Sequence, residues 1–92
     1  MTTQDMIVTT CDEIKGVLLE KNRKYGDSAL NPVRIFRKAS ASEQILVRLD
    51  DKLSRLRSQQ VDEDEDVILD LIGYLILLRI SLEMQYADTR AD

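Results

Sequence analysis

The stretch from Val67 to Ile80 constrains the fold most, because eleven of its fourteen residues are apolar. In a helix these residues would surround the whole circumference, so nearly every side would need to be covered. Two further helices of one small chain cannot do this. Asp70 interrupts the stretch, which is also shorter than the roughly 20 residues that span a bilayer. We therefore expect an all-α, three-helix unit that assembles into a homo-oligomeric helical bundle, a dimer or a tetramer, without a membrane partner.

Apolar spacing and breakers divide the chain into three predicted helices. They cover about residues 4–24, 41–59 and 62–86, with a loop over 25–40, in a single domain of residues 1–92. A Ser-x-x-Glu capping box at Ser40 begins the second helix, and an Asp-x-x-Glu pattern at Asp62 begins the third. A loop of this length in a small domain is often functional.

Two residue types limit the chemistry. The chain has no histidine and one cysteine, Cys11. Histidine-based catalysis, a structural zinc site and an internal disulfide are therefore excluded. A bound metal would need carboxylate ligands, which favours Mg²⁺, with Mn²⁺ as the alternative. The single thiol favours a reducing compartment, so we expect a cytoplasmic protein.

Charge is distributed unevenly along the chain. Residues 21–57 carry ten bases and four acids, whereas residues 62–92 carry nine acids and two bases. A basic middle folded against an acidic end could be self-complementary, or it could hold an anion beside a metal. The net charge of −4 and the lack of a DNA-binding motif argue against duplex nucleic acid as a partner.

Acidic residues of the third predicted helix form the first candidate site. Glu63, Asp66 and Asp70 would lie on one face, and carboxylates spaced i, i+4 can share a divalent cation. Acids in a first helical turn also favour the helix dipole without any function. Asp70 lies deeper, between apolar neighbours, so it is either functional or paired with a base of the second helix.

The second predicted helix carries charges on both edges of its apolar stripe. Glu43 and Asp50 border one edge, whereas Arg48 and Lys52 border the other. Asp50 can face the acids of the third helix and share the metal, although a position without any function is equally consistent with the pattern. Arg48 and Lys52 are candidate phosphate ligands.

The end of the first helix and the following turn form a third candidate site. Lys21 and Lys24 can bind phosphate, Tyr25 can stack on a base, and Ser28 or Asn31 can read the edge of that base. Basic residues at a helix C-terminus also interact favourably with the dipole, so a purely structural role stays open.

Three segments carry a family resemblance: Tyr25-Gly26-Asp27-Ser28, Arg48-x-Asp50-Asp51-Lys52-Leu53-Ser54-Arg55 and Glu65-Asp66-x-x-x-Asp70-Leu71-Ile72-Gly73-Tyr74. Over roughly residues 12 to 82 the chain resembles the nucleotide modification associated domain 1 family, which is common in phages and their hosts. That family looks like a relative of the MazG-type all-α nucleoside triphosphate pyrophosphohydrolases, which hold magnesium at a dimer interface. The resemblance implies a phage or host protein acting in the host cytoplasm.

The resemblance also implies roles for the candidate residues. Asp50, Asp66 and Asp70 would be catalytic and, with Glu43 or Glu63, would hold Mg²⁺. The products would be a nucleoside monophosphate and pyrophosphate. Position 67 is Val, where the usual Glu-x-x-Asp motif has an acid. Two alternatives to the enzyme stay open: a module that binds a nucleotide or nucleotide-derived molecule without cleaving it, and a structural homo-oligomer or adaptor.

Overall fold

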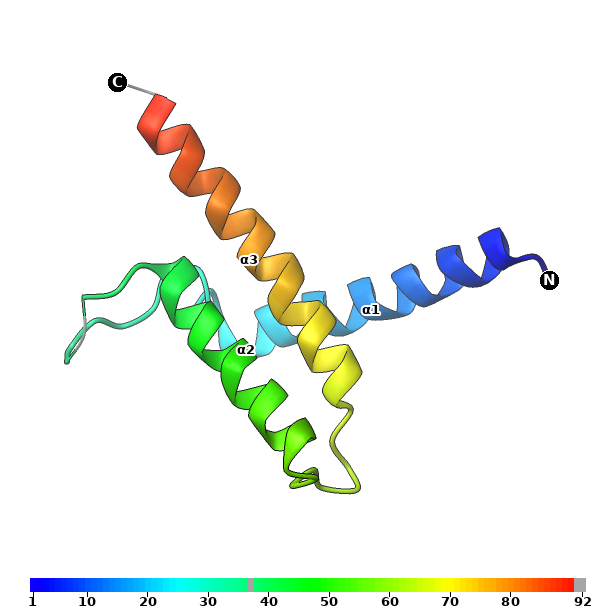
Figure 1. Ribbon diagram of the computed structural model, residues 1–92. Helices are drawn as coiled ribbons and strands as arrows, with labels where there is room; N and C mark the ends of the chain where they lie inside the picture. The colour runs from blue at the N-terminus through cyan, green and yellow to red at the C-terminus, as the bar shows by residue number, and fades with distance from the viewer. Residues whose placement is uncertain (37, 91–92) are drawn as a thin grey trace.

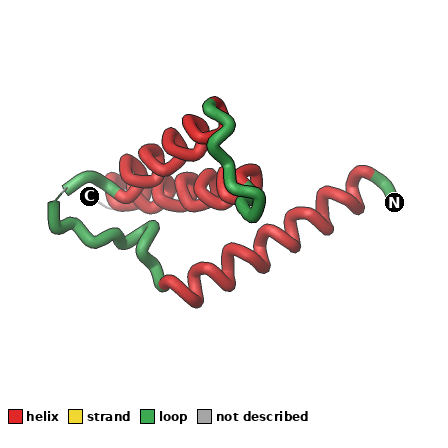
Figure 2. The backbone as a smooth tube through the Cα atoms, turned by 90° about the horizontal axis from the view of Figure 1, so that it is seen from below, coloured by secondary structure: helices red, strands yellow, loops and turns green. Residues whose placement is uncertain are grey.

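Three α-helices make up the regular structure of the protein, which we describe from a computed structural model over residues 1–36 and 38–90. These are α1 (Thr3–Tyr25), α2 (Ala41–Arg57) and α3 (Val67–Arg90), and no strand occurs within those residues. The predicted all-α class is confirmed. Helices α2 and α3 lie side by side and antiparallel, whereas α1 crosses near the first half of α3 (Figure 1). The N-terminal half of α1 extends beyond the α2–α3 pair in both views (Figures 1 and 2).

The ends of α1 follow from its capping residues. The Thr2 hydroxyl accepts the N–H of Asp5 at 3.1 Å, and the Asp5 carboxylate accepts the N–H of Thr2 at 3.0 Å. This reciprocal pair satisfies two amide groups that a helix start leaves unpaired. At the other end Gly26 has φ +70°, a conformation that glycine adopts without steric cost.

Helix α2 begins where the sequence predicts and ends earlier. The Ser40 hydroxyl accepts the N–H of Glu43 at 3.2 Å, which caps the helix start. The end predicted near residue 59 lies slightly too late, because Arg57 is the last helical residue and Gln59 has a positive φ of 58°. A left-handed residue ends a right-handed helix.

The predicted start of α3 at residue 62 is wrong. The helix begins at Val67, and the carboxylate that caps it belongs to Asp66, which accepts the N–H of Leu69 at 3.0 Å. Residues 62–66 form a connection in which the N–H of Glu65 donates to the carbonyl of Asp62. The acidic run therefore precedes the helix, and Glu63 and Asp66 do not share a helical face with Asp70. At the far end the helix continues to Arg90, beyond the predicted residue 86.

The core of one chain is small and lies between α2 and α3. Ile45, Leu49 and Val67 are its buried apolar side chains among the described residues. Beside them the hydroxyls of Ser42 and Ser81 form a buried hydrogen bond of 2.8 Å across the helix pair. Such small residues let the two helices approach closely.

Helix α1 has no buried residue and meets α3 through Leu18. The Leu18 side chain lies against Gly73, so close that a Cβ on this glycine would be 2.8 Å from Leu18 Cδ2. Upstream of this contact, Ile7 and Cys11 repeat at helical spacing, yet both are exposed, Ile7 at 57%.

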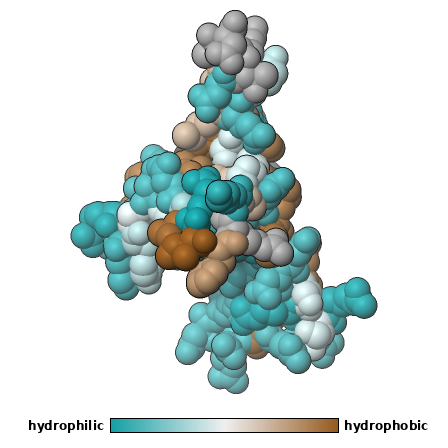
Figure 3. All heavy atoms as spheres, turned by 90° about the vertical axis from the view of Figure 1, so that its left-hand side faces the viewer, coloured by the Kyte–Doolittle hydropathy of each residue, from teal (hydrophilic) through white to brown (hydrophobic). Residues whose placement is uncertain are grey.

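Apolar side chains are exposed elsewhere too. On α3 Ile68, Leu75 and Leu82 are 69%, 52% and 49% exposed, and in the loop before α2 Phe36 is 97% exposed. The face that carries this loop shows a hydrophobic patch among hydrophilic residues (Figure 3). One chain therefore leaves much of α3 uncovered. Within the described residues no helix is long and apolar enough to span a membrane.

Candidate functional site

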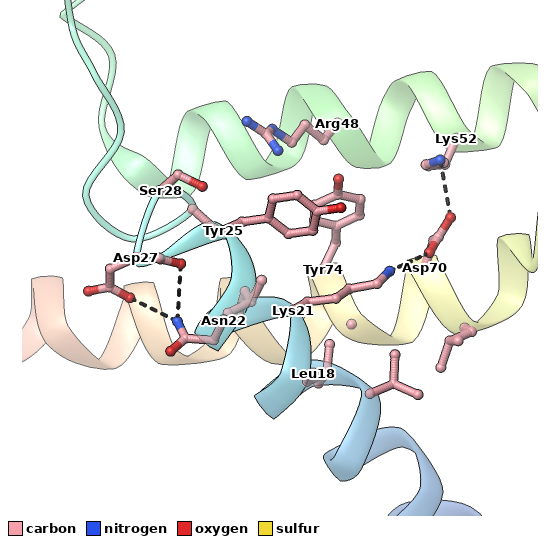
Figure 4. Close-up of a pocket in the computed structure, with 16 residues that line it drawn as sticks. Leu18, Lys21, Asn22, Tyr25, Asp27, Ser28, Arg48, Lys52, Asp70 and Tyr74 are labelled. Atoms are coloured by element: carbon pink, nitrogen blue, oxygen red, sulfur yellow. Dashed lines mark hydrogen bonds and ion pairs between the residues drawn. The ribbon is translucent and has the colours of Figure 1, made fainter.

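A cavity of about 350 Å³ lies where the C-terminal half of α1 and the turn after it meet α2 and the first turns of α3 (Figure 4). The sequence-predicted site residues around it are Lys21, Tyr25, Ser28, Arg48, Lys52 and Asp70. They come from segments up to 49 positions apart in the chain, which the fold brings to one place.

The position of α1 is set by its contact with α3. Because Gly73 has no side chain, Leu18 can pack closely against α3 at this point. Lys21 and Tyr25, one and two turns further along α1, then lie at the cavity. The missing Cβ of Gly73 is therefore what allows α1 to form this wall.

The turn after α1 is held by amide side chains. The Nδ2 of Asn31 donates to Asp27 Oδ2 at 2.8 Å, and the N–H of Asn31 donates to the Asp27 carbonyl at 2.8 Å. Asn22 Nδ2 donates to the carbonyl of Gly26 at 3.3 Å and to Asp27 Oδ1 at 3.4 Å. These bonds occupy the Asp27 carboxylate and keep Ser28 at the cavity edge (Figure 4).

Asp70 lies between two lysines from different helices. Its Oδ1 is 3.3 Å from Lys21 Nζ, and its Oδ2 is 3.2 Å from Lys52 Nζ. The side chains of Asp70 and Lys52 are mostly shielded, at 19% and 16% exposed, whereas Lys21 is 51% exposed. The predicted partner of Asp70, a base of the second helix, is therefore present, and a base of α1 joins it.

Glu65 supports the site without lining the cavity, and it is not among the candidate residues that the sequence indicates. Its carboxylate accepts from Lys52 Nζ at 2.6 Å and from Arg55 at 2.7 Å, and it is 12% exposed. The hydrogen bond from Lys52 holds the pKa of the Glu65 carboxyl below its ordinary 4.5 and raises the pKa of Lys52. The spacing of Lys52 and Arg55, three residues apart on one face of α2, was the signal for such a shared partner.

Tyr74 is the second residue that sequence reasoning did not place in the site. The Arg48 guanidinium lies 5.9 Å from the centroid of its ring, within range of a cation–π interaction. Tyr74 follows Asp70 by four positions, so the two share a face of α3, and this spacing was the available signal. The cavity thus has two tyrosine rings, Tyr25 and Tyr74.

Two predicted ligand contacts lie away from the cavity wall. Lys24 does not line the cavity, and its Nζ lies 5.3 Å from the centroid of the Tyr25 ring. Asn31 is engaged with Asp27, so it supports the turn and does not line the cavity.

The five carboxylates predicted to hold magnesium do not come together in one chain. Glu43 and Asp50 are exposed on α2, away from the cavity, whereas Glu63 and Asp66 border a neighbouring open groove beside Asp70. Among the described residues no three Asp, Glu, Cys or His side chains are arranged to hold a metal ion. Because Asp70 is paired with lysines as well, these residues do not fit a magnesium site within one chain, and that site stays a prediction.

The chemistry of the cavity suits an anion with a flat ring. It combines three bases and two tyrosine rings with two carboxylates, of which Asp27 is tied to its own turn and Asp70 to the lysines. Searches for related proteins found no matching family model, no matching curated protein and no matching solved structure.

Proposed function

We propose that the cavity binds a nucleotide or a nucleotide-derived molecule. The observation that carries the proposal is the convergence of Lys21, Arg48 and Lys52 on the same cavity as the rings of Tyr25 and Tyr74. Bases bind phosphate oxygens through charge-assisted hydrogen bonds, and aromatic rings stack on any nucleobase. The volume of about 350 Å³ lies at the lower end of the range usual for small-molecule sites.

Arg48 is the base best placed to receive phosphate. Lys21 and Lys52 already pair with Asp70, whereas the contact of Arg48 within the described residues is with the face of the Tyr74 ring. A guanidinium can keep that ring contact while its N–H groups bind phosphate bidentately. Arg48 also lies four positions before Lys52, so the two project from the same side of α2.

Binding, and not cleavage, is the activity that this geometry supports best. Magnesium-assisted hydrolysis needs a group of carboxylates to hold the ion. The five predicted ligands are spread over α2, the α2–α3 connection and α3, and no such group occurs among the described residues. We therefore propose a binding module, and an assay of pyrophosphate release from the common nucleoside triphosphates with Mg²⁺ tests whether the ligand is also hydrolysed.

A thermal-shift panel of nucleotides, with and without Mg²⁺, tests the proposal, because a ligand that binds the folded state raises the melting temperature. Isothermal titration then compares the best nucleotide on wild type and on Arg48→Gln. Loss of a charge-assisted contact should weaken binding by roughly ten- to a hundredfold.

Arg57→Gln is the matched control, because Arg57 is an exposed base on the same helix that does not line the cavity. It should bind like wild type. A panel in which no nucleotide raises the melting temperature would refute the proposal, and so would equal affinities of Arg48→Gln and wild type.

We further propose that the protein works as a homo-oligomer in which a second copy covers α1 and α3. The support is the apolar surface that one chain leaves open: Ile7 on α1, Leu75 and Leu82 on α3, and Phe36 in the loop. The acidic residues 62–92 and the basic residues 21–57 also give two copies complementary charge. Sedimentation analysis should find a dimer or a tetramer, and Leu82→Glu should shift it toward the single chain with its helical circular dichroism kept.

A further inference from the structure

We infer that Asp70 is an internal competitor for the phosphate groups of the ligand: it holds Lys21 and Lys52 until a phosphate displaces it. This inference rests on the proposed function. It concerns which residue sets the affinity and which ligands the site prefers.

The geometry of Asp70 resembles that of a bound phosphate. Each of its two oxygens meets a different ammonium group, Lys21 Nζ at 3.3 Å and Lys52 Nζ at 3.2 Å (Figure 4). Two oxygens of one phosphate group can make the same pair of contacts. The carboxylate therefore occupies the positions that an incoming phosphate would take.

The contacts of Asp70 are also the exchangeable ones in this cluster. Both are longer than the 2.6 Å contact between Lys52 and Glu65, and the Lys21 side chain is 51% exposed. Water and salt weaken the pair with the half-exposed Lys21. The pair with Lys52 is mostly shielded, so the greater charge of an incoming phosphate has to outcompete it. When Asp70 is displaced, Lys52 stays in place, because Glu65 still holds it from the other side.

Charge decides which ligands can displace the carboxylate. Asp70 brings one negative charge, whereas a single phosphate monoester brings about −1.5 to −2 at pH 7 and a chain of two or three phosphates brings more. Arg48 lies one turn from Lys52, a rise of about 6 Å along α2, so consecutive phosphates can reach both bases. We therefore expect the site to prefer nucleoside di- or triphosphates and inorganic pyrophosphate over a nucleoside monophosphate.

Removal of Asp70 should change the affinity for the ligand in opposite directions under this role and under a metal-binding role. If Asp70 were needed to hold magnesium for the ligand, its removal would weaken binding. If it competes with phosphate, its removal strengthens binding in the absence of any metal.

The test is titration of inorganic pyrophosphate and of ATP into the full chain, in magnesium-free buffer with a chelator and fixed low salt. Asp70→Asn keeps the shape of the side chain and removes the charge, so its affinity for pyrophosphate should rise by about tenfold. Asp70→Ser should give the same direction and serves if the amide variant folds poorly. AMP should bind wild type more weakly than ATP.

Asp12→Asn is the matched control, because Asp12 is an exposed carboxylate on α1, 3.7 Å from Lys15, that does not line the cavity. It should bind pyrophosphate like wild type. Wild type that binds ATP, with folded Asp70 variants that bind it equally or more weakly, overturns the inference and leaves the proposed function standing. Failure of ATP and pyrophosphate to bind either protein overturns the inference, and the nucleotide panel then decides whether the proposed function falls with it.

Discussion

At the scale of single residues, the structure of the site depends on which acid pairs with which base. The sequence separated Asp70 from the other acids correctly, because an aspartate between apolar neighbours in a helix needs a partner. It could not identify Glu65 as the second partner of Lys52, because Glu65 lies in a run of five consecutive acids and only the course of the α2–α3 connection selects one of them. The sequence pattern cannot show which of several neighbouring acids forms a given ion pair.

The ion pairs of Glu65 predict a pH-dependent stability. Because its pKa is lowered in the folded protein, the ionised carboxyl stabilises the fold above the ordinary value of 4.5, and this contribution is lost as the pH falls through the lowered pKa. Glu65→Gln should therefore melt at a lower temperature than wild type at pH 7, and the difference should shrink below pH 4.5.

Glu63→Gln is the control for this melting series, because Glu63 is an exposed acid of the same connection. Its melting temperature should stay near that of wild type at both pH values. A Glu65→Gln difference that is as large at pH 3 as at pH 7 would show that the charge is not responsible.

At the scale of helices, apolar spacing located all three elements, and the errors lie at their ends. The third helix begins at Val67 because the carboxylate of Asp66 caps it, whereas the sequence pattern favoured Asp62. Both positions offer an acid before an apolar run, so local chemistry allows either. The pairing of Glu65 with Lys52 and Arg55 fixes the connection, and such a contact across 10 to 13 positions is invisible to local patterns.

Two glycines on facing helices should respond differently to alanine. Around Gly16 on α1 a Cβ would meet open space, so Gly16→Ala should stabilise the protein by about 0.5–1 kcal/mol through its higher helix propensity. At Gly73 the added Cβ would lie 2.8 Å from Leu18, so α1 must shift and this gain should be reduced or lost. Thermal melts of the two variants measure both changes in stability.

The same two variants test whether the contact between Leu18 and Gly73 positions the cavity wall. Because Leu18 and Gly73 set the position of the wall that carries Lys21 and Tyr25, Gly73→Ala should weaken nucleotide binding, whereas Gly16→Ala should not. Equal binding by both variants would mean that the Leu18 contact does not position the site.

At the scale of the whole molecule, the sequence anticipated that one chain would not cover its last helix. The apolar run from Val67 to Ile80 leaves Ile68, Leu75 and Ile76 exposed in the single chain. What the sequence did not reveal is that α1 would cover so little, because an apolar stripe tells which face seeks a partner and not whether that partner belongs to the same chain. For the predicted magnesium ligands, too, the sequence does not tell whether the residues that would meet them belong to the same chain.

If a second copy completes the fold, stability must depend on protein concentration. Association by the folded state adds a mass-action term, so each tenfold dilution should lower the melting temperature by a few degrees. Leu82→Glu should melt lower than wild type and independently of concentration. A wild-type melting temperature that is constant over a hundredfold dilution would contradict the proposed assembly.

The N-terminal half of α1, which extends beyond the other two helices, carries a natural site for a fluorescent label. Cys11 is the sole cysteine of the chain and is exposed in this half, so a maleimide dye would attach at one defined position without any substitution. Burial of that stretch against another molecule would slow the labelling and change the emission of a dye already attached. Docking of α1 could thus be followed in real time on unmutated protein.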